Sequence, residues 1–443
     1  MPQHTLYWFT QDLRIHDNHA LKAAQDSSHL LCIYIVDPRW FEKKRWQHAS
    51  MGGHRWSFVQ ECLSDLAQKL QTLGQRLHIY YGKPEDIIPN LCHTYDLDHL
   101  LCARMAGSYE QATVKAIDDA LPSVTVERTD HYTLFESPNL PVLLEEWPAS
   151  YTPFRKMAEP VATKNVLHAP GSLPPMPTSF ALPSIQRPNW VPASAPSQCA
   201  FRGGETEALQ HLKAYFSSEL PLDYKNVRNA LDGWDNSSKF SPWLNQGCLS
   251  ARQVKSALEQ YENENGSNES TRWLYAELLW REYFQWSHHK IGVKLFRFKG
   301  VAKKGPLTSY YAERYQKWCE GQTPYALVNA CMKELKITGY LSNRGRQIVA
   351  SCLVNELSID WRYGAAWFEH QLVDYDVAVN WGNWQYIAGV GADLRGGRHF
   401  NLEKQTSIYD PEGEYRKKWG GHVVGPLDSV DAADWPIMPT EQY

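Results

Sequence analysis

The 443-residue sequence lacks the features that would assign it to a metal-binding, exported or membrane class. Its nine cysteines include no CxxC pair and no zinc-like spacing with histidine, so no metal site is expected. No apolar run approaches the roughly 18 to 20 residues of a membrane helix, and the N-terminus lacks the basic and apolar regions of a secretion signal. We therefore expect a cytoplasmic protein with reduced thiols and no membrane contact.

The sequence also has little net charge. Its formal charge is −4, and its acids and bases are spread evenly, so the whole chain gives no signal for nucleic acid. A polyanionic partner would have to meet a local patch of cations. There is no internal repeat or low-complexity tract, while 43% of the residues are hydrophobic, which is enough for the cores of two domains. A monomer is the expected state.

The first 130 residues alternate short β-rich runs with helix-like segments. This alternation is typical of a parallel sheet with crossover helices, and it predicts a Rossmann-like α/β domain over residues 1–130. The clearest helix covers residues 57–73, where apolar residues recur every three or four positions, and Gly74 suits its C-terminus. The predicted strands are 6–9, 30–36, 77–81, 99–103 and 125–128.

Proline and aromatic residues divide the rest of the chain. Thirteen of the 26 prolines fall within residues 131–200, which predicts an irregular connector that wraps over the domains. Residues 201–443 are helical in pattern and hold twelve of the 18 tryptophans, so we expect an all-helical second domain. Its expected helices lie near 205–217, 251–262, 271–288, 341–356 and 363–374.

The segment 374–391, DYDVAVNWGNWQYIAGVG, crowds acids, amides and aromatic rings between small residues. Acids and amides are costly to bury beside large rings unless each polar atom meets a partner. The mixture therefore indicates a planar polar ligand with ring faces and ring edges, and a flavin is such a ligand. The run GVG at 389–391 is no dinucleotide fingerprint, because it neither follows a strand nor opens a βαβ unit.

A second motif, NSSKFSPWL at 236–244, combines hydroxyls, a cation and a proline at the start of a predicted helix. Such a turn can present backbone amides and hydroxyls to phosphate. An ordinary serine N-cap would give the same pattern, so this motif alone leaves the choice open.

Four further motifs follow one another along the chain: WFTQDLRIHDN at 8–18, WREYF at 280–284, TGYLSNRGRQ at 338–347 and IDWR at 359–362. Together with the two motifs above, they resemble the photolyase/cryptochrome family over nearly the whole chain. SNRGRQ at 342–347, NWGNW at 380–384, Tyr386 and AGVG at 388–391 are similar to the DASH cryptochromes in particular. The resemblance implies an α/β antenna domain and a helical catalytic domain that binds folded FAD.

The resemblance assigns FAD contacts residue by residue. Lys239 stands where many family members have arginine, and a cation there suits a diphosphate. Each assigned residue has the simpler alternative of a helix-surface or capping role. The implied contacts are Tyr224, Ser237, Ser238, Lys239 and Ser241 at the phosphates, Arg346 and Asp374 as an ion pair flanking the flavin, Asp376 as a further carboxylate and Asn380 beside the reactive ring nitrogen.

The implied activity is that of a deoxyribodipyrimidine photolyase, a carbon–carbon lyase that splits cyclobutane pyrimidine dimers by light-driven electron donation from reduced FAD. By resemblance, Glu277 hydrogen-bonds the dimer and Trp280 stacks on it. Helical spacing would let these two and Arg281 face one pocket. A buried ring beside an ordinary i,i+4 surface ion pair is the alternative for the three residues.

Single-stranded DNA is the expected substrate. Asn343 and Arg344 match positions near the lesion and its phosphates, while Gln347 and Tyr386 replace the Met and Trp of many duplex-repairing photolyases. Weaker apolar contact gives less compensation for flipping a lesion out of a duplex. RNA is a second single-stranded partner.

The predicted nucleic-acid patch is the stretch 281–304, which interleaves cations and rings and contains one acid, Glu282. Cations for phosphate and rings for bases are what single-strand binding uses, although a charge run is also typical of any solvated face. The cations are Arg281, Lys290, Lys294, Arg297, Lys299, Lys303 and Lys304, and the rings are Tyr283, Phe284, Trp286, Phe296 and Phe298.

Two positions depart from the family pattern. Trp384 and Trp361 match the inner members of the tryptophan chain that carries electrons to the flavin, although either could be a core residue. The third member falls at Thr308, which cannot relay electrons, and the candidates to replace it are Trp318, Tyr310, Tyr311 and Tyr315.

The second departure concerns an antenna, 5,10-methenyltetrahydrofolate. Met105 is aligned with the carboxylate of folate-binding members, with Glu110 nearby, so the sequence leaves an antenna open. The expected function is thus dimer repair in single-stranded DNA. The alternatives are a blue-light photoreceptor that signals without repair, and a flavoprotein that binds RNA or DNA without chemistry and for which Glu277 is dispensable.

Overall fold

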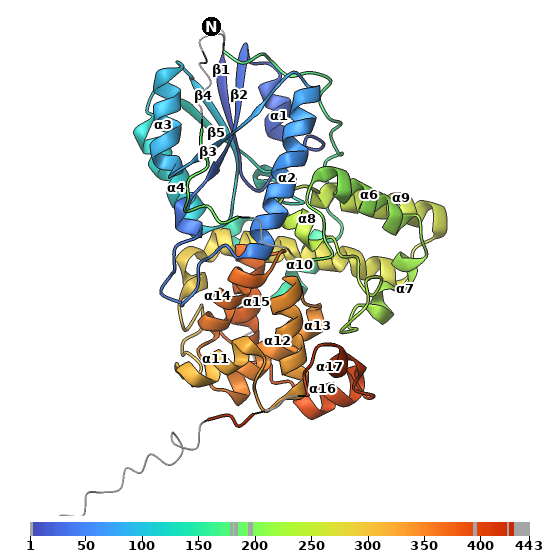
Figure 1. Cartoon of the computed structure of the whole chain (residues 1–443). Coiled ribbons are helices and arrows are strands. Elements are labelled where there is room, and N and C mark those ends of the chain that lie inside the picture. The colour runs from blue at the N-terminus through green and yellow to red at the C-terminus, as the bar shows by residue number, and fades with distance from the viewer. Residues whose placement is uncertain are drawn as a thin grey trace, which may run out of the picture.

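The computed structural model describes residues 3–177, 180, 185–193, 198–392, 397–422 and 425–428. It contains an α/β domain followed by a helical domain, with an irregular strap running over both (Figure 1). The predicted fold class is confirmed. Among the described residues, no helix combines the length and apolar character needed to cross a membrane.

The α/β domain is built on one parallel sheet with the strand order β3-β2-β1-β4-β5. The chain therefore reverses direction across the sheet between β1 and β4, which is the doubly wound arrangement. Each predicted strand lies within two residues of an observed one. The strands are β1 (His4–Phe9), β2 (His29–Val36), β3 (Leu77–Tyr81), β4 (His99–Ala103) and β5 (Thr125–Thr129).

Helices cover both faces of this sheet, α1 (His19–Ala24) and α2 (Gly53–Thr72) on one side and α3 (Pro84–Thr94) and α4 (Ser108–Ala120) on the other (Figure 1). The alternating side chains of β1 enter two cores, since Leu6 packs with Ile88 of α3 while Tyr7 packs with Leu66 of α2. The core on the α2 side continues into the helical domain. Helix α2 begins four residues earlier than predicted, and Gly74 after it has a φ of +81°.

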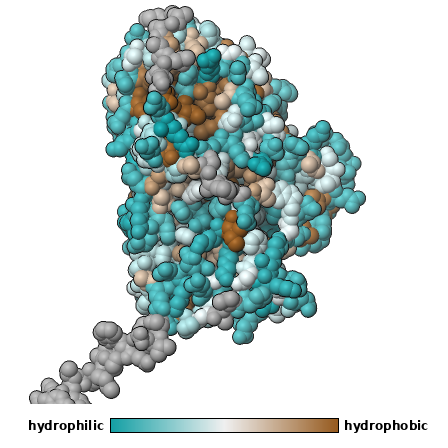
Figure 2. Space-filling view, in the orientation of Figure 1, coloured by the Kyte–Doolittle hydropathy of each residue, from teal (hydrophilic) through white to brown (hydrophobic). Residues whose placement is uncertain are grey.

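The strap contains two short 3-10 turns and the helix α5 (Tyr151–Ala158). Trp147 and Phe154 pack against Tyr283 of the helical domain, and Leu173 donates its amide to the Leu73 carbonyl at the end of α2. The described part of the strap therefore contacts both domains. On the face shown in Figure 2, apolar side chains gather on the α/β domain, while the surface of the helical domain is mainly hydrophilic.

The helices predicted in the helical domain differ from the observed ones mainly at their ends. The helix expected over 341–356 is an α-helix followed by a π-helical turn, Cys352–Glu356, so its backbone register shifts near the candidate site. The α-helices are α6 (Glu205–Phe216), α7 (Leu220–Val227), α8 (Ser241–Asn245), α9 (Ala251–Asn265), α10 (Glu269–Ile291), α11 (Ala312–Glu320), α12 (Ala326–Thr338), α13 (Asn343–Ser351), α14 (Trp361–Gln371), α15 (Val377–Ile387), α16 (Leu402–Tyr409) and α17 (Glu414–Lys418). Of these, α7, α11, α12, α15, α16 and α17 were not predicted individually.

A buried ionic network joins the two domains at the carboxyl ends of the strands. Arg252 of α9 donates from Nε to Oδ2 of Asp17 at 3.0 Å, and both side chains are almost wholly inaccessible to solvent. Arg14 donates to the carbonyl oxygens of Gly247 and His131 at 2.9 and 2.6 Å. The motif at 8–18 thus has a structural role that its sequence pattern did not reveal.

Removing one partner of this network should destabilise the protein strongly. Arg252→Ala leaves the buried carboxylate of Asp17 without its cation, so we expect the free energy of unfolding to fall by about 3 to 5 kcal/mol. Urea denaturation followed by circular dichroism measures this. The control, Arg155→Ala, breaks an exposed i,i+4 pair with Glu159 and should cost less than about 1 kcal/mol. Equal losses in the two variants would contradict a special role for the buried pair.

Candidate functional site

The carboxylate of Asp374 lies at the centre of the candidate site and accepts hydrogen bonds from several of its residues. Its oxygens accept two hydrogen bonds from Nη2 of Arg346 on α13, at 3.0 and 2.8 Å, and one from the Ser241 hydroxyl at 2.6 Å. Asn245 donates to the Asp374 backbone carbonyl. The predicted ion pair is therefore present, and it fixes the start of α8 against α13. The attraction of Asp374 raises the pKa of Arg346 against the opposing effect of burial.

Asp376 caps α15 and ties that helix to the strap and to α10. Its Oδ1 accepts the Val379 amide at 2.8 Å, while its Oδ2 accepts Nε2 of Gln285 at 2.7 Å and the Tyr132 hydroxyl. Only 2% of this residue is exposed, so its charge depends on these donors. Tyr132 and Gln285 were missed by the sequence reasoning. Tyr132 follows the last strand of a doubly wound sheet, a position where binding residues often lie.

The turn before α8 holds a buried cation. Lys239 has a φ of +55°, in the left-handed region that non-glycine residues seldom adopt, and is 9% exposed. Its ammonium group lies 5.0 Å from the Tyr340 ring centre, and within the described residues it has no ion-pair partner. Burial lowers the pKa of Lys239. A nearby anion would offset this cost of burial, so the turn fits a phosphate group.

The serine N-cap alternative is wrong for this turn, because Phe240 caps α8 and Ser241 is the first helical residue. The other proposed phosphate contacts lie around it. The Ser238 carbonyl accepts Nε2 of His211 at 2.8 Å, while Ser237 hydrogen-bonds Tyr340. Tyr224 on α7 is 8% exposed, and burial raises its pKa.

Two further observations fit a polar ligand beside this turn and the acids. Asn380 on α15 is 8% exposed, and its Nδ2 donates to the Ala365 carbonyl at 3.0 Å. Arg281 is also 8% exposed, yet in the described structure its Nε and Nη2 have no hydrogen-bond partner. Buried guanidinium donors are rarely left unpaired, so the residues present fit a polar cofactor.

Arg281 and Glu277, expected to face one pocket, have different partners. Nη1 of Arg281 donates to the Tyr132 carbonyl at 2.9 Å, and its guanidinium lies over the Tyr132 ring. Glu277 instead forms an ion pair with Nη2 of Arg228 and accepts a hydrogen bond from Nε1 of Trp273, each at 3.0 Å. The i,i+4 ion pair is therefore absent as well. Burial raises the pKa of Glu277, against the lowering effect of Arg228.

Trp280 and Tyr386 lie close together, with ring centres 6.3 Å apart in an edge-to-face arrangement. Trp280 also stacks on Tyr151 of the strap, at 3.7 Å and 12° between the rings. Arg398 lies over the Tyr386 ring at 4.9 Å. These contacts place the two proposed lesion-facing rings beside one another.

The residues expected on α13 lie at its beginning. Asn343 is exposed, Gln347 is partly buried, and Nη2 of Arg344 donates to Oδ1 of Asn229 at 3.1 Å. The Arg344 guanidinium also lies over the rings of Phe400 and Tyr409. Arg344 thus bridges α13, the loop after α7 and the segment that leads into α16.

Much of the predicted basic aromatic patch is wrong. The stretch 281–286 of α10 is buried on every side, so Arg281, Glu282, Tyr283, Phe284 and Trp286 are unavailable to bases. Lys290 is anchored by the Glu145 and Trp147 carbonyls. The rings of Phe296 and Phe298 are partly buried. The cations that remain exposed are Lys294, Arg297, Lys299, Lys303 and Lys304.

The two matched tryptophans are buried in the helical core. Trp361 donates from Nε1 to the Phe298 carbonyl at 3.0 Å and contacts the Trp381 ring. The ring of Trp384 lies so close to Gly364 that a Cβ at that glycine would be 2.2 Å from it. Thr308 lies beside this region, since its neighbour Ser309 bonds the backbone of Ser358.

The aligned antenna position does not fit the folate contact of the family. Met105 is 8% exposed and packs with Ala103 and Tyr132, so it offers no carboxylate. Glu110 lies in the first turn of α4. We therefore assign no step to an antenna.

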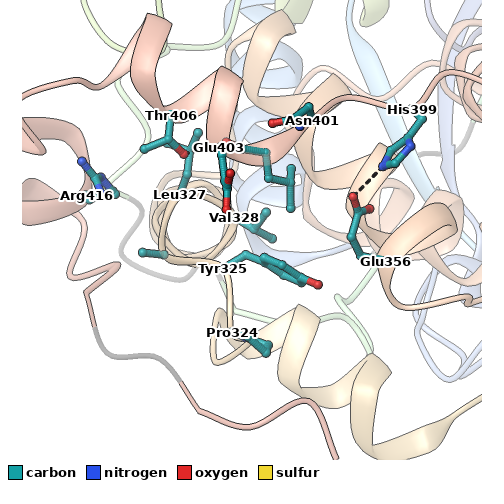
Figure 3. Close-up of a pocket in the computed structure, with 12 residues that line it drawn as sticks. Pro324, Tyr325, Leu327, Val328, Glu356, His399, Asn401, Glu403, Thr406 and Arg416 are labelled. Atoms are coloured by element: carbon teal, nitrogen blue, oxygen red, sulfur yellow. Dashed lines mark hydrogen bonds and ion pairs between the residues drawn. The ribbon is translucent and has the colours of Figure 1, made fainter.

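A separate cavity of about 520 Å³ lies between the start of α12 and α16 (Figure 3). Within it Nε2 of His399 lies 2.8 Å from Oε1 of Glu356. None of the residues assigned above lines it, so this cavity is not the candidate flavin site. Its lining residues are Pro324, Tyr325, Ala326, Leu327, Val328, Glu356, His399, Asn401, Leu402, Glu403, Thr406 and Arg416.

Comparison with known proteins identifies the family of this chain. The family model of the FAD binding domain of DNA photolyase matches residues 273–431, and the DNA photolyase model matches residues 5–177. Cryptochrome DASH of Idiomarina loihiensis is 47% identical over 98% of this chain and 96% of its own length. The chain belongs to the photolyase/cryptochrome family, as a DASH-type cryptochrome. In the part that the structure describes, no cluster of three or more potential metal ligands occurs.

Solved structures agree with this assignment. A cryptochrome of Synechocystis sp. superposes with a TM-score of 0.90 at 39% identity, over 95% of this chain and 89% of that one. A class III photolyase of Agrobacterium tumefaciens superposes with a TM-score of 0.81 at 27% identity, over 95% and 86% of the two chains. Of the candidate site, Arg346, Asp374, Asp376 and Asn380 lie within the region matched by the model of the FAD binding domain, whereas the turn with Lys239 precedes that region.

Glu334 of α12 lies near the Lys239 turn of this DASH-type protein and should make its stability depend on pH. Burial raises the pKa of Glu334 to about 7, against the lowering effect of the Tyr415 hydroxyl that it accepts. Because the folded protein binds this proton more tightly than the unfolded chain, the free energy of unfolding should fall as the pH rises from 4.5 to about 7.

Thermal denaturation of Glu334→Gln tests this sign. The amide retains an acceptor for Tyr415 but cannot ionise, so the variant should lose less stability than the parent between about pH 5 and pH 8, by on the order of 3 kcal/mol. Parallel pH profiles for the two proteins would show that Glu334 does not titrate in this range.

Proposed function

We propose that the protein binds FAD in the helical domain and repairs cyclobutane pyrimidine dimers in single-stranded DNA by light-driven electron transfer. Arg346, Asp374 and Asp376 would hold the flavin, with Asn380 beside its ring. Lys239, Ser237 and Ser238 would meet the diphosphate. When bound, FAD supplies the photochemical electron donation, and the protein supplies position and electrostatics.

The observation that carries this proposal is the arrangement of Glu277 beside aromatic rings. Glu277 is held by Arg228 and Trp273, one helical turn from Trp280, and Trp280 meets Tyr386. A dimer bound beside this pair of rings would contact Trp280 and accept a hydrogen bond from the Glu277 carboxyl. Burial raises the pKa of that carboxyl against the lowering effect of Arg228, and its protonated form would donate to a dimer radical anion.

The surface around this point suits a single strand. Arg398 brings a cation over the Tyr386 ring, and Arg228 brings another to Glu277. Tyr386 and Gln347 offer less apolar contact to a flipped lesion than the Trp and Met of duplex-repairing relatives. An unpaired strand removes the cost of extracting the lesion from a base-paired stack.

Glu277→Gln tests the assigned role. The variant keeps an acceptor for Trp273 but not the acidic donor, so dimer splitting by the chemically reduced protein under blue light should slow about 10- to 100-fold. The matched control is Glu259→Gln on the exposed side of α9, where no change is expected. Loss of thymine dimers is followed by chromatography of a single-stranded oligonucleotide. Unchanged splitting in Glu277→Gln would contradict its role, and no splitting by the parent would contradict repair.

Strand preference is tested by placing the same dimer in a single strand, in an unpaired bulge and in a full duplex. We expect the splitting rate to fall in that order, because the cost of flipping the lesion rises. Tyr386→Trp should reduce the difference between single strand and duplex by enlarging the apolar contact. Equal parent rates on all three substrates would contradict the preference.

A blue-light receptor that signals without repair is the second candidate function, favoured by the cryptochrome names of the relatives. The absence of dimer splitting together with a light-driven change in flavin absorbance would support it. Equal RNA and DNA binding without splitting would instead support a nucleic-acid-binding flavoprotein.

A further inference from the structure

An unbroken series of oxidisable rings leads from Trp384 to the protein surface by way of α11. The ring centre of Trp318 lies 6.2 Å from that of Trp384 and 6.3 Å from that of Tyr315. Tyr315 lies 5.4 Å from Tyr363, which stacks on Tyr310 at 4.3 Å. These separations lie in the range over which aromatic side chains contact one another. Tyr310 is 38% exposed, so the series ends at solvent.

The hydroxyl of Tyr315, in the middle of this series, donates to the Tyr363 carbonyl at 3.2 Å and also contacts a histidine nitrogen. The Tyr315 hydroxyl lies 2.9 Å from Nε2 of His48, which comes from the α/β domain. His48 also packs against the Trp367 ring and against His370, whose Nδ1 bonds the Ala49 carbonyl. Burial, His370 and Lys43 lower the pKa of His48 to about 4, so the imidazole is neutral near pH 7.

The route through Trp361 has no comparable outer end. Trp361 and Trp381 are each at most 2% exposed, and the ring beyond Trp381 is Phe296, which is hard to oxidise. Thr308 stands where the family has its third tryptophan and has no oxidisable ring. The described structure therefore directs electron flow from the surface along α11.

We propose that Trp318 and the hydrogen-bonded Tyr315–His48 pair re-reduce Trp384 and so form the electron entry route of this protein. The entry at Trp384 rests on the proposed flavin site. An electron that leaves Trp384 towards a photoexcited oxidised cofactor is replaced from Trp318, and Tyr315 then gives one electron to Trp318. The phenolic proton of Tyr315 moves from Oη to Nε2 of His48.

The cycle closes with an external one-electron donor of the thiol class. The thiol gives one electron through Tyr310 and Tyr363 to the Tyr315 radical and releases its own proton to solvent. His48 returns the stored proton to Oη. Two such turnovers oxidise two thiols to one disulfide, so atoms and electrons balance.

The test uses the flavin-loaded protein with a small thiol under blue light. In the parent, freeze-quenched electron paramagnetic resonance should detect a tyrosine radical while the oxidised flavin absorbance is lost. Trp318→Phe should abolish the radical and slow that loss at least about tenfold. Tyr315→Phe should replace the tyrosine radical by a tryptophan radical. Trp367→Phe is the matched control, because its ring touches His48 without lying on the route, and it should behave like the parent.

A second readout needs neither light nor flavin chemistry. With nitrogen-15-labelled histidine, the ring resonances of His48 should shift in Tyr315→Phe, because the hydrogen bond to Nε2 is lost. The proposal is overturned if Trp318→Phe keeps the tyrosine radical while Trp361→Phe removes it, or if the His48 resonances do not change.

Failure of the route is distinguishable from failure of repair. Chemical reduction of the flavin bypasses the route, so dimer splitting by chemically reduced Trp318→Phe should equal that of the parent and also shows that the variant is folded. A parent protein that forms the tyrosine radical but splits no dimer would refute the repair proposal and leave the electron route standing.

Discussion

The buried charge of the segment 374–376 is the constraint on which the helical domain depends. Burying a charged carboxylate costs free energy unless hydrogen-bond donors surround it. The donors to the two acids here come from segments distant in the sequence. Asp374 accepts hydrogen bonds from Arg346 of α13, Ser241 of α8 and Asn245. Asp376 draws in Gln285 of α10 and Tyr132 of the strap. The folded domain is therefore built around the same charges that would meet the cofactor, so the site is largely organised before a ligand arrives.

The same logic extends across the domain boundary. Arg252 of the helical domain forms a buried ion pair with Asp17 of the α/β domain. Tyr132 can hydrogen-bond Asp376 only when the strap is packed in place. His48 is a third such link, because a loop of the α/β domain delivers it to Tyr315. In doubly wound proteins the end of the sheet near the switch between β1 and β4 commonly holds a ligand. Here that edge carries ionic links to the helical domain, so the α/β domain acts mainly as a support for the neighbouring site.

Sequence patterns predicted the elements well because each pattern is local. Strand alternation located the sheet, and helical spacing located six of the helices to within a few residues. The motif resemblance identified residues such as Asp374 and Arg346 that the fold brings together. The errors came from partners far away in the chain. The spacing of Glu277 and Arg281 favours one shared face, yet Arg281 is drawn to Tyr132, 149 residues earlier, and Glu277 to Arg228. The apparent ring-and-cation patch failed for a similar reason, since nothing in residues 281–286 indicates that this stretch of α10 is covered on every side.

The electron route shows what geometry adds to a list of candidate residues. Trp318 and Tyr315 are three positions apart on α11, so helical spacing alone places their rings on one face. That spacing cannot reveal which ring receives the electron, because Trp384 and Tyr363 come from α15 and α14. It also cannot reveal His48, which makes oxidation of Tyr315 feasible by taking its proton. A threonine at position 308 therefore need not cut off electron supply to Trp384. The proposed route along α11 starts at Trp384 itself and does not pass through Trp361.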